Sequence, residues 1–167
     1  LMTAMVTLDA GLPMDEQIEI TKDDRDLIRL TGSRLKFGSQ LTRRELLILA
    51  LMASENRAAA ALGRSFPGGT ESFVGAMNRK AQELGMHQSR FADPAGLDAD
   101  NVASAQDLAR MVFAAMHYPA IREATTRISF EVRPLKKRGP LRYVNTNRLL
   151  RNDHWRIQVS KTGYINE

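Results

Sequence analysis

The stretch TRRELLILALMASENRAAAAL, residues 42–62, combines a helix start, an apolar helix and a polar break before a second helix. Thr42-Arg-Arg-Glu45 matches a capping box, in which the Thr42 hydroxyl accepts from the backbone of residue 45 and Glu45 reaches back to the cap. The apolar run 46–53 predicts a helix that is buried on nearly every side. The alanine-rich residues 58–62 predict the second helix.

Helical spacing of apolar residues recurs elsewhere, and strand-like alternation follows it along the chain. Further helices are expected over 1–8, over 70–84 with a cap at Thr70 and a stop at Gly85, and over 104–115 with a stop at Pro119. Short strands are expected in the polar region 15–37, and alternation predicts longer ones over 128–132 and 155–159. The succession predicts an α+β fold, with a helical region beside an antiparallel sheet that is incomplete at both ends of the chain.

Composition excludes several classes of protein. The 167 residues suit one domain, and 43% hydrophobic and 26% charged residues are typical of a globular one. The absence of cysteine excludes a disulfide scaffold and a thiol nucleophile. The three histidines lack metal-binding spacing, so no metal site is predicted. The longest apolar run has eight residues, against the roughly 18 that a membrane span needs.

The net charge of +5 is unevenly distributed. Residues 1–121 carry a net charge of −2, whereas residues 122–167 carry +7. Such a basic C-terminal part is compatible with an anionic partner, although charge alone favours a solvated basic surface. The cluster of Arg133, Lys136, Lys137 and Arg138 has no nucleic-acid-binding motif beside it, so nucleic acid is not expected as a partner.

Two short motifs point to chemistry. Ser54-Glu-Asn56 lies at the helix–helix junction, where a turn with capping side chains is the simpler explanation. Lys161-Thr162-Gly163 follows the alternating segment, and an ammonium and a hydroxyl at a strand edge can hold a substrate carboxylate. Gly163 would leave that edge open for an extended peptide to bind as an added strand.

These motifs, in this order and 107 residues apart, resemble those of the serine penicillin-binding enzymes. The whole chain resembles the low-molecular-mass D-alanyl-D-alanine peptidases (family S11), most closely the endopeptidases of penicillin-binding protein 7 type. The resemblance rests on these segments: Leu1-Met-Thr-Ala-Met5, Leu51-Met-Ala-Ser-Glu-Asn-Arg-Ala-Ala59, Phe91-x-Asp-Pro-x-Gly-Leu97, Asn101, Ser104-Ala-x-Asp-Leu-Ala109, Asn145-Thr-Asn147 and Lys161-Thr-Gly163. It implies a β-lactamase/D,D-peptidase-like fold and a partial domain over 1–167.

The chain's one Ser-x-x-Lys sequence, Ser33-Arg-Leu-Lys36, lies outside the segments that carry the resemblance. The family's nucleophile motif has the same form. The resemblance places that motif directly before Leu1. It further implies that Ser54 relays a proton, that Asn56 orients the active-site lysine and that Lys161 is the catalytic cation. Lys161, Thr162, Gly163 and Tyr164 would bind substrate, with the Tyr164 backbone N–H as an oxyanion-hole donor. No metal or organic cofactor is implied.

The implied substrates are peptidoglycan stem peptides and their cross-links, and β-lactams would be inhibitors that acylate the same serine. The implied location is the periplasm or the outer face of the cytoplasmic membrane. Membrane attachment, oligomeric state and the choice between endopeptidase and carboxypeptidase activity are left open by these residues.

Alternative functions are a non-catalytic module that binds cell-wall peptide, or an inactive fragment. A β-lactamase of class A is disfavoured, since no Glu-x-x-Leu-Asn signature lies between Asn56 and Lys161. A calcium loop at Asp98-x-Asp100 is excluded, because Val102 and Ala109 stand where an EF-hand needs oxygen ligands.

Overall fold

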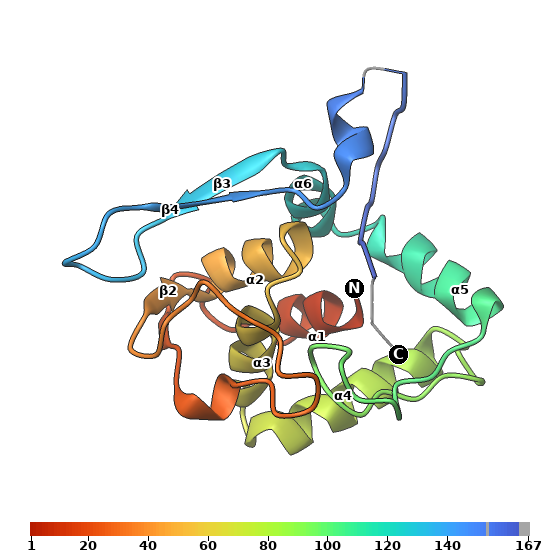
Figure 1. Cartoon of the computed structure of the whole chain (residues 1–167). Coiled ribbons are helices and arrows are strands. Elements are labelled where there is room, and N and C mark those ends of the chain that lie inside the picture. Colours follow the sequence, from red (N-terminus) through yellow and green to blue (C-terminus); the bar gives the residue numbers. More distant parts are fainter. Residues whose placement is uncertain (153, 164–167) are drawn as a thin grey trace.

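The computed structural model of the protein describes residues 1–152 and 154–163. Helices and strands alternate irregularly along the chain (Figure 1). In chain order they are α1 (Met2–Asp9), β1 (Gln17–Glu19), the 3-10 helix η1 (Lys22–Asp24), β2 (Gln40–Thr42), α2 (Arg43–Met52), α3 (Asn56–Arg64), α4 (Gly69–Glu83), α5 (Ala105–Ala115), α6 (Pro119–Thr126), β3 (Ser129–Val132), β4 (Leu141–Val144) and the 3-10 helix η2 (Arg148–Arg151). No helix within the described residues is both long and apolar enough to cross a membrane.

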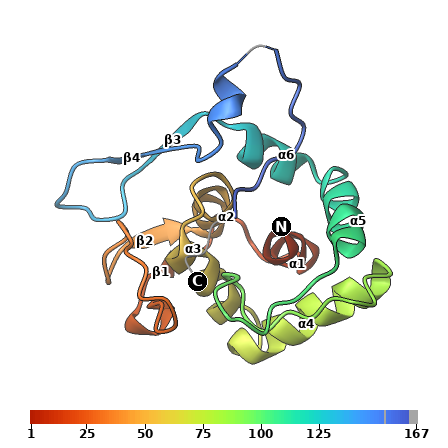
Figure 2. The same ribbon diagram turned by 45° about the vertical axis from the view of Figure 1, so that its right-hand side comes forward.

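The core forms around α2, which packs against α3, α6 and β3. Leu46, Leu49 and Met52 of this helix have no exposed surface. Helix α1 also lies inside, in contact with α2, α3 and α4, and Figure 2 shows it end-on with the other helices around it. Burial on nearly every side explains why the apolar run of α2 lacks the polar stripe of a surface helix.

The local signals of α2 are confirmed. The Thr42 hydroxyl accepts a hydrogen bond from the Glu45 amide (3.1 Å), and a Glu45 carboxylate oxygen accepts from the Thr42 amide (2.7 Å). Gly85 follows the helix expected over 70–84 and has a φ of +70°, a backbone conformation that glycine adopts without steric cost. Ser104 caps α5 by accepting from the Asp107 amide, as expected.

Two helix boundaries were predicted wrongly. Pro119 does not mark the end of the helix expected over 104–115. It is the first residue of α6, where the N–H that proline lacks would have no partner within the helix. Thr70 does not cap α4; the N-cap is Gly68, whose φ is +83°. The N-cap therefore lies two residues earlier than expected, and no side-chain hydrogen bond caps the helix.

The strands form two antiparallel pairs. Strand β1 pairs with β2, with Ile18 opposite Leu41, and β3 pairs with β4, with Phe130 opposite Tyr143. The expected strand over 128–132 is thus confirmed, whereas its partner β4 was not predicted. The β3–β4 hairpin lies across α2 (Figure 1) and carries the basic cluster 133–138 in its connecting loop.

The strand predicted over 155–159 is not formed. Within the described residues no strand pairs with this segment, and 64% of the Trp155 surface is exposed. An alternating pattern becomes a strand only where a neighbouring backbone supplies the ladder of hydrogen bonds. The pattern at Leu27, Ile28 and Leu30 fails for the same reason, and these side chains are exposed on a loop.

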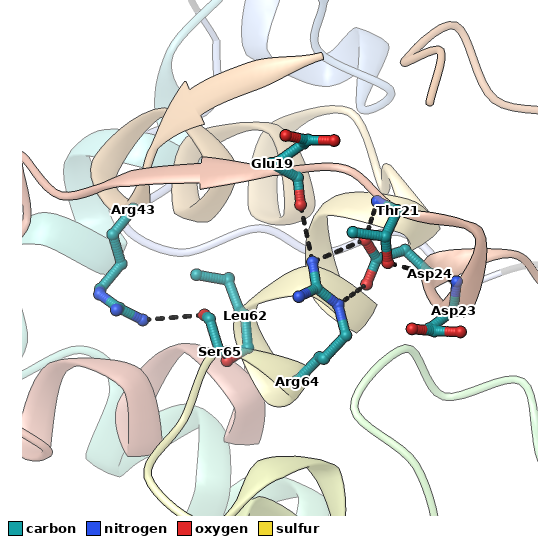
Figure 3. Close-up of polar contacts among 8 residues, drawn as sticks. All are labelled: Glu19, Thr21, Asp23, Asp24, Arg43, Leu62, Arg64 and Ser65. Carbon is teal, nitrogen blue, oxygen red and sulfur yellow. Dashed lines mark hydrogen bonds and ion pairs between the residues drawn. The ribbon is translucent and has the colours of Figure 1, made fainter. Parts of the chain in front are cut away.

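A buried ion pair fixes the loop after β1 to helix α3. Arg64 donates from Nε to Asp24 Oδ1 (2.8 Å) and from Nη2 to the Glu19 carbonyl oxygen (2.7 Å), as Figure 3 shows. Asp24 also accepts from the Thr21 amide (2.8 Å), and its side chain has no exposed surface. The ion pair therefore fixes the position at which the loop over residues 25–31 starts. This loop lies beside the candidate site.

Gly63 of α3 is a close-packed position. A Cβ there would lie 2.4 Å from Cγ of Pro94, in the loop over 91–101. Gly63→Ala is expected to lower the free energy of unfolding by about 1–3 kcal/mol, because either the loop or the helix must shift. Denaturant unfolding would measure this, with Gly139→Ala as the control, since a Cβ added at Gly139 would meet no heavy atom within 4 Å. Equal stability of the two variants would contradict the close packing.

Candidate active site

Ser54 stands at the break between two helices. Helix α2 ends at Met52, and the Glu55 amide donates back to the Leu49 carbonyl (3.2 Å), which closes the turn. Ser54 has a φ of +52°, a left-handed conformation that is uncommon for a residue with a side chain. Strained backbone of this kind persists where the surrounding structure fixes it, and it is frequent at functional sites.

Lys161 and Thr162 meet Ser54 in space. Lys161 Nζ donates to Ser54 Oγ (2.5 Å) and to the Thr162 carbonyl oxygen (2.7 Å). The hydroxyl oxygens of Ser54 and Thr162 are 3.2 Å apart. The structure therefore brings together two motifs that are separated by 107 residues in the sequence.

Thr146 completes this cluster, although the sequence alone assigns it no role. Its Oγ1 is 2.6 Å from Oγ1 of Thr162, and its amide donates to the Met52 carbonyl at the end of α2 (3.2 Å). Next to it, the Asn147 side-chain amide donates to Ser160 Oγ (2.7 Å). The Asn145-Thr-Asn147 motif thus connects the segment that carries Lys161 to the helices, which is a role that only the family resemblance could have signalled.

An open groove of about 670 Å³ runs past these side chains. Its lining residues are Thr31, Ser54, Asn56, Ala95, Gly96, Leu97, Thr146, Lys161, Thr162 and Gly163. Every candidate site residue that the structure describes therefore lies on one groove. Tyr164, the remaining candidate, lies outside the described residues.

Asn56 is the first residue of α3, and its side chain turns to the edge of the groove. Its Nδ2 donates to Thr31 Oγ1 (3.0 Å), so it contacts a loop rather than Lys161. Ser54 and Asn56, which were both expected to be catalytic, thus have different partners in this structure. Ser54 pairs with Lys161, and Asn56 pairs with Thr31.

The start of α1 lies next to the same cluster. Leu1 lines a small cavity of about 70 Å³ together with Ser54, Asn56 and Lys161. Residue 1 therefore lies close to the cluster of Ser54 and Lys161.

Desolvation acts on Lys161. Although much of this residue is exposed, its ammonium end points inward to Ser54, and burial lowers its pKa below the ordinary lysine value. A cation, two or three hydroxyls and an amide around a groove can bind a carboxylate or a carbonyl oxygen and can transfer a proton. No group of three or more His, Cys, Asp or Glu side chains that could hold a metal ion is found among the described residues.

The strain at Ser54 gives a stability prediction. Ser54→Gly is expected to be more stable than Ser54→Ala by about 1 kcal/mol, because glycine adopts positive φ without the steric cost that alanine has. Both variants lose the hydroxyl that contacts Lys161, so the comparison isolates the backbone effect. Thermal and denaturant unfolding of the two variants would test this, and a more stable alanine variant would show that the backbone at residue 54 carries no strain.

Comparisons with known proteins find related peptidases. A model of the peptidase S11 family, described as D-alanyl-D-alanine carboxypeptidase, matches residues 1–167. A D-alanyl-D-alanine endopeptidase of Pseudomonas aeruginosa is 46% identical over the whole chain, which covers 54% of that relative. One from Escherichia coli is 42% identical over 99% of the chain and 54% of the relative. The chain thus spans about half the length of the curated relatives that it matches.

Solved structures show the same fold. The DD-transpeptidase of Streptomyces K15 superposes with a TM-score of 0.88 at 27% identity, over 99% of this chain and 69% of the transpeptidase. A D-alanyl-D-alanine carboxypeptidase of Mycobacterium tuberculosis superposes with a TM-score of 0.84 at 30% identity, over 99% and 61% of the two chains. The expected helical region beside antiparallel strands is therefore confirmed as a D,D-peptidase-like arrangement.

Proposed function

Because the chain belongs to the peptidase S11 family of D-alanyl-D-alanine carboxypeptidases, we propose that the protein containing it is a serine D,D-peptidase of peptidoglycan. The observation that carries the proposal is the contact of Lys161 Nζ with Ser54 Oγ (2.5 Å) beside Thr162, on one open groove. These are the side chains to which the family resemblance gives catalytic and substrate-binding roles.

The nucleophile is a serine in the segment that precedes Leu1, and the activating lysine is the residue next to Leu1. The position of Leu1 supports this, since it shares a cavity with Ser54, Asn56 and Lys161. A lysine takes a proton from serine only when it is neutral, which requires a lowered pKa. The positive charge of Lys161, which lines the same cavity as Leu1, would lower the pKa of a lysine beside it.

The reaction is acyl transfer in two steps. The serine oxygen attacks the carbonyl carbon of a D-alanine residue, and its proton passes to the neutral lysine. The C–N bond breaks, the leaving amine receives a proton through the Ser54 hydroxyl, and an ester to the serine remains. Water then hydrolyses the ester. Lys161 and Thr162 hold the substrate carboxylate or an equivalent polar group, and Tyr164 offers its backbone N–H to the developing oxyanion.

The substrate class follows from the relatives. Two relatives above 40% identity are named D-alanyl-D-alanine endopeptidases, so we favour cleavage of peptide cross-links over removal of a terminal D-alanine. Because peptidoglycan lies outside the cytoplasmic membrane, we propose that the protein acts in the periplasm or on the outer face of that membrane. β-Lactams are inhibitors in this proposal because they acylate the same serine.

The proposal is tested on the full-length protein with a purified cross-linked muropeptide dimer and a pentapeptide monomer as substrates. We expect the dimer to be split into monomers, and Ser54→Ala to remove this activity. If both substrates are bound but neither is cleaved, and penicillin forms no adduct, the protein is a non-catalytic binding module instead.

A further inference from the structure

We propose that Asp26 and Thr31 are positioning residues for Asn56, and that a hydrogen-bond relay through them fixes which end of the Asn56 amide faces the groove. The inference rests on the proposed function, because it assigns Asn56 the role of orienting the active-site lysine and the substrate amide. Neither residue belongs to the motifs that carry the family resemblance, and both lie in the loop between η1 and β2.

A single carboxylate organises this loop. Asp26 Oδ1 accepts from the amides of Ile28 and Arg29, each at 2.9 Å. Asp26 Oδ2 accepts from the amide of Thr31 (2.8 Å) and from its hydroxyl (2.7 Å). These four bonds close residues 26–31 into a tight turn around one side chain.

Burial does not hold this turn in place. Leu27, Ile28 and Leu30 expose 74%, 54% and 69% of their surfaces, and Leu30 has a φ of +52°. Exposed apolar side chains and a left-handed leucine are both unfavourable. The hydrogen bonds to Asp26 therefore stabilise a conformation that burial does not favour.

The direction of each hydrogen bond follows from the chemistry of the three groups. An ionised carboxylate only accepts, so the Thr31 hydroxyl must donate its one proton to Asp26. The bonds from Thr31 and from the loop amides outweigh desolvation and lower the pKa of Asp26 to about 2, so that it is ionised at neutral pH. Thr31 Oγ1 can then only accept from Asn56, which means that the Asn56 NH2 group, not its carbonyl, faces the loop.

This orientation determines which hydrogen-bonding groups of the Asn56 side chain are available in the groove. Its carbonyl oxygen is directed away from Thr31 and is available to accept from an ammonium group. Its second amide hydrogen is available to donate to a substrate carbonyl. A reversed amide would present two donors to the lysine that it has to orient. Thr31 and Asn56 both line the groove, so the relay ends at the site of reaction.

The test is the second-order rate constant for acylation of the full-length protein by a fluorescent penicillin. Thr31→Val removes the hydroxyl at almost constant shape and is expected to lower this constant about tenfold, the effect of losing one positioning hydrogen bond. Thr31→Ser keeps the hydroxyl and is expected to restore most of the rate. Asp26→Ala is expected to act in the same direction as Thr31→Val, whereas Asp23→Asn, a neighbouring change of charge, is expected to leave the rate unchanged.

A merely structural role is separated from positioning by a double-mutant cycle. In an Asn56→Ala background Thr31→Val is expected to have no further effect, because the group that it positions is gone. An equal tenfold loss in that background, or a wild-type rate in Thr31→Val, would overturn the inference. Loss of rate together with a large fall in melting temperature in both Thr31 variants would also count against it.

A second readout does not depend on acylation. The side-chain amide signals of Asn56 in an NMR spectrum, assigned by their loss in Asn56→Ala, are expected to move in Thr31→Val and Asp26→Ala but not in Asp23→Asn. If the wild type is not acylated while these signals move, the proposed function fails and the relay stands. If the wild type is acylated while the signals stay in place, the relay fails and the function stands.

Discussion

Replacing Lys161 by alanine is expected to lower the rate constant for acylation by benzylpenicillin at least about a hundredfold, the scale on which a lost electrostatic group affects catalysis. Lys161 Nζ donates to Ser54 Oγ, and Lys161 lines the same cavity as Leu1, before which we place the nucleophile and its lysine. The variant loses the fixed cation, the orientation of the Ser54 proton and a binding group for the substrate carboxylate.

Stability should hardly change in this variant, because much of the Lys161 residue is exposed and substitutions at such positions usually alter the free energy of unfolding by less than about 0.5 kcal/mol. The matched control is Lys136→Ala in the β3–β4 loop, which removes the same charge outside the groove and should be acylated normally. Stopped-flow or gel-based acylation would measure both variants. An unchanged rate in Lys161→Ala would remove Lys161 from the mechanism.

Arg64→Leu is expected to destabilise the protein most strongly, by about 3–5 kcal/mol, the range for removing one partner of a buried ion pair. The change leaves the fully buried carboxylate of Asp24 without its guanidinium partner, as the geometry in Figure 3 makes clear. The Glu19 carbonyl also loses a donor. The loop over residues 22–31, and with it the Asp26 turn, loses its attachment to α3.

The control is Arg127→Leu, which breaks a surface ion pair with Glu123, 69% of whose side chain is exposed. Pairs of this kind contribute about 0.2–1 kcal/mol, so this variant should unfold close to the wild type. Urea unfolding of the full-length proteins compares the two. Similar losses of stability in the two variants would show that the burial of Asp24 does not make its ion pair with Arg64 stronger than an exposed ion pair.

Local signals in the sequence predicted much of the helical part. The capping box at Thr42 and the Gly85 stop depend on neighbours within four residues, so they can be read without tertiary information. Pro119 was misread because proline suits both the end of one helix and the first turn of the next. The segment over 155–159 was misread because a strand depends on a distant partner that periodicity does not reveal.

The site was predicted in part. The family motifs identified Ser54, Asn56 and Lys161, and the structure places all three on the groove. Thr146 and the Asp26 turn were missed because their roles arise from contacts with residues far away in the sequence: Thr146 contacts Met52 and Thr162, and Thr31 contacts Asn56. Only the folded arrangement shows that these loops support the candidate catalytic side chains.

The central claim is that the groove at Ser54 and Lys161 serves a serine in the segment before Leu1. The most direct measurement is the intact mass of the full-length protein with and without benzylpenicillin, followed by peptide mapping of the adduct. We predict a mass increase of one penicillin per chain, with the adduct on a serine three residues before a lysine that immediately precedes Leu1. No adduct, or an adduct on a residue within 1–167, would contradict the account.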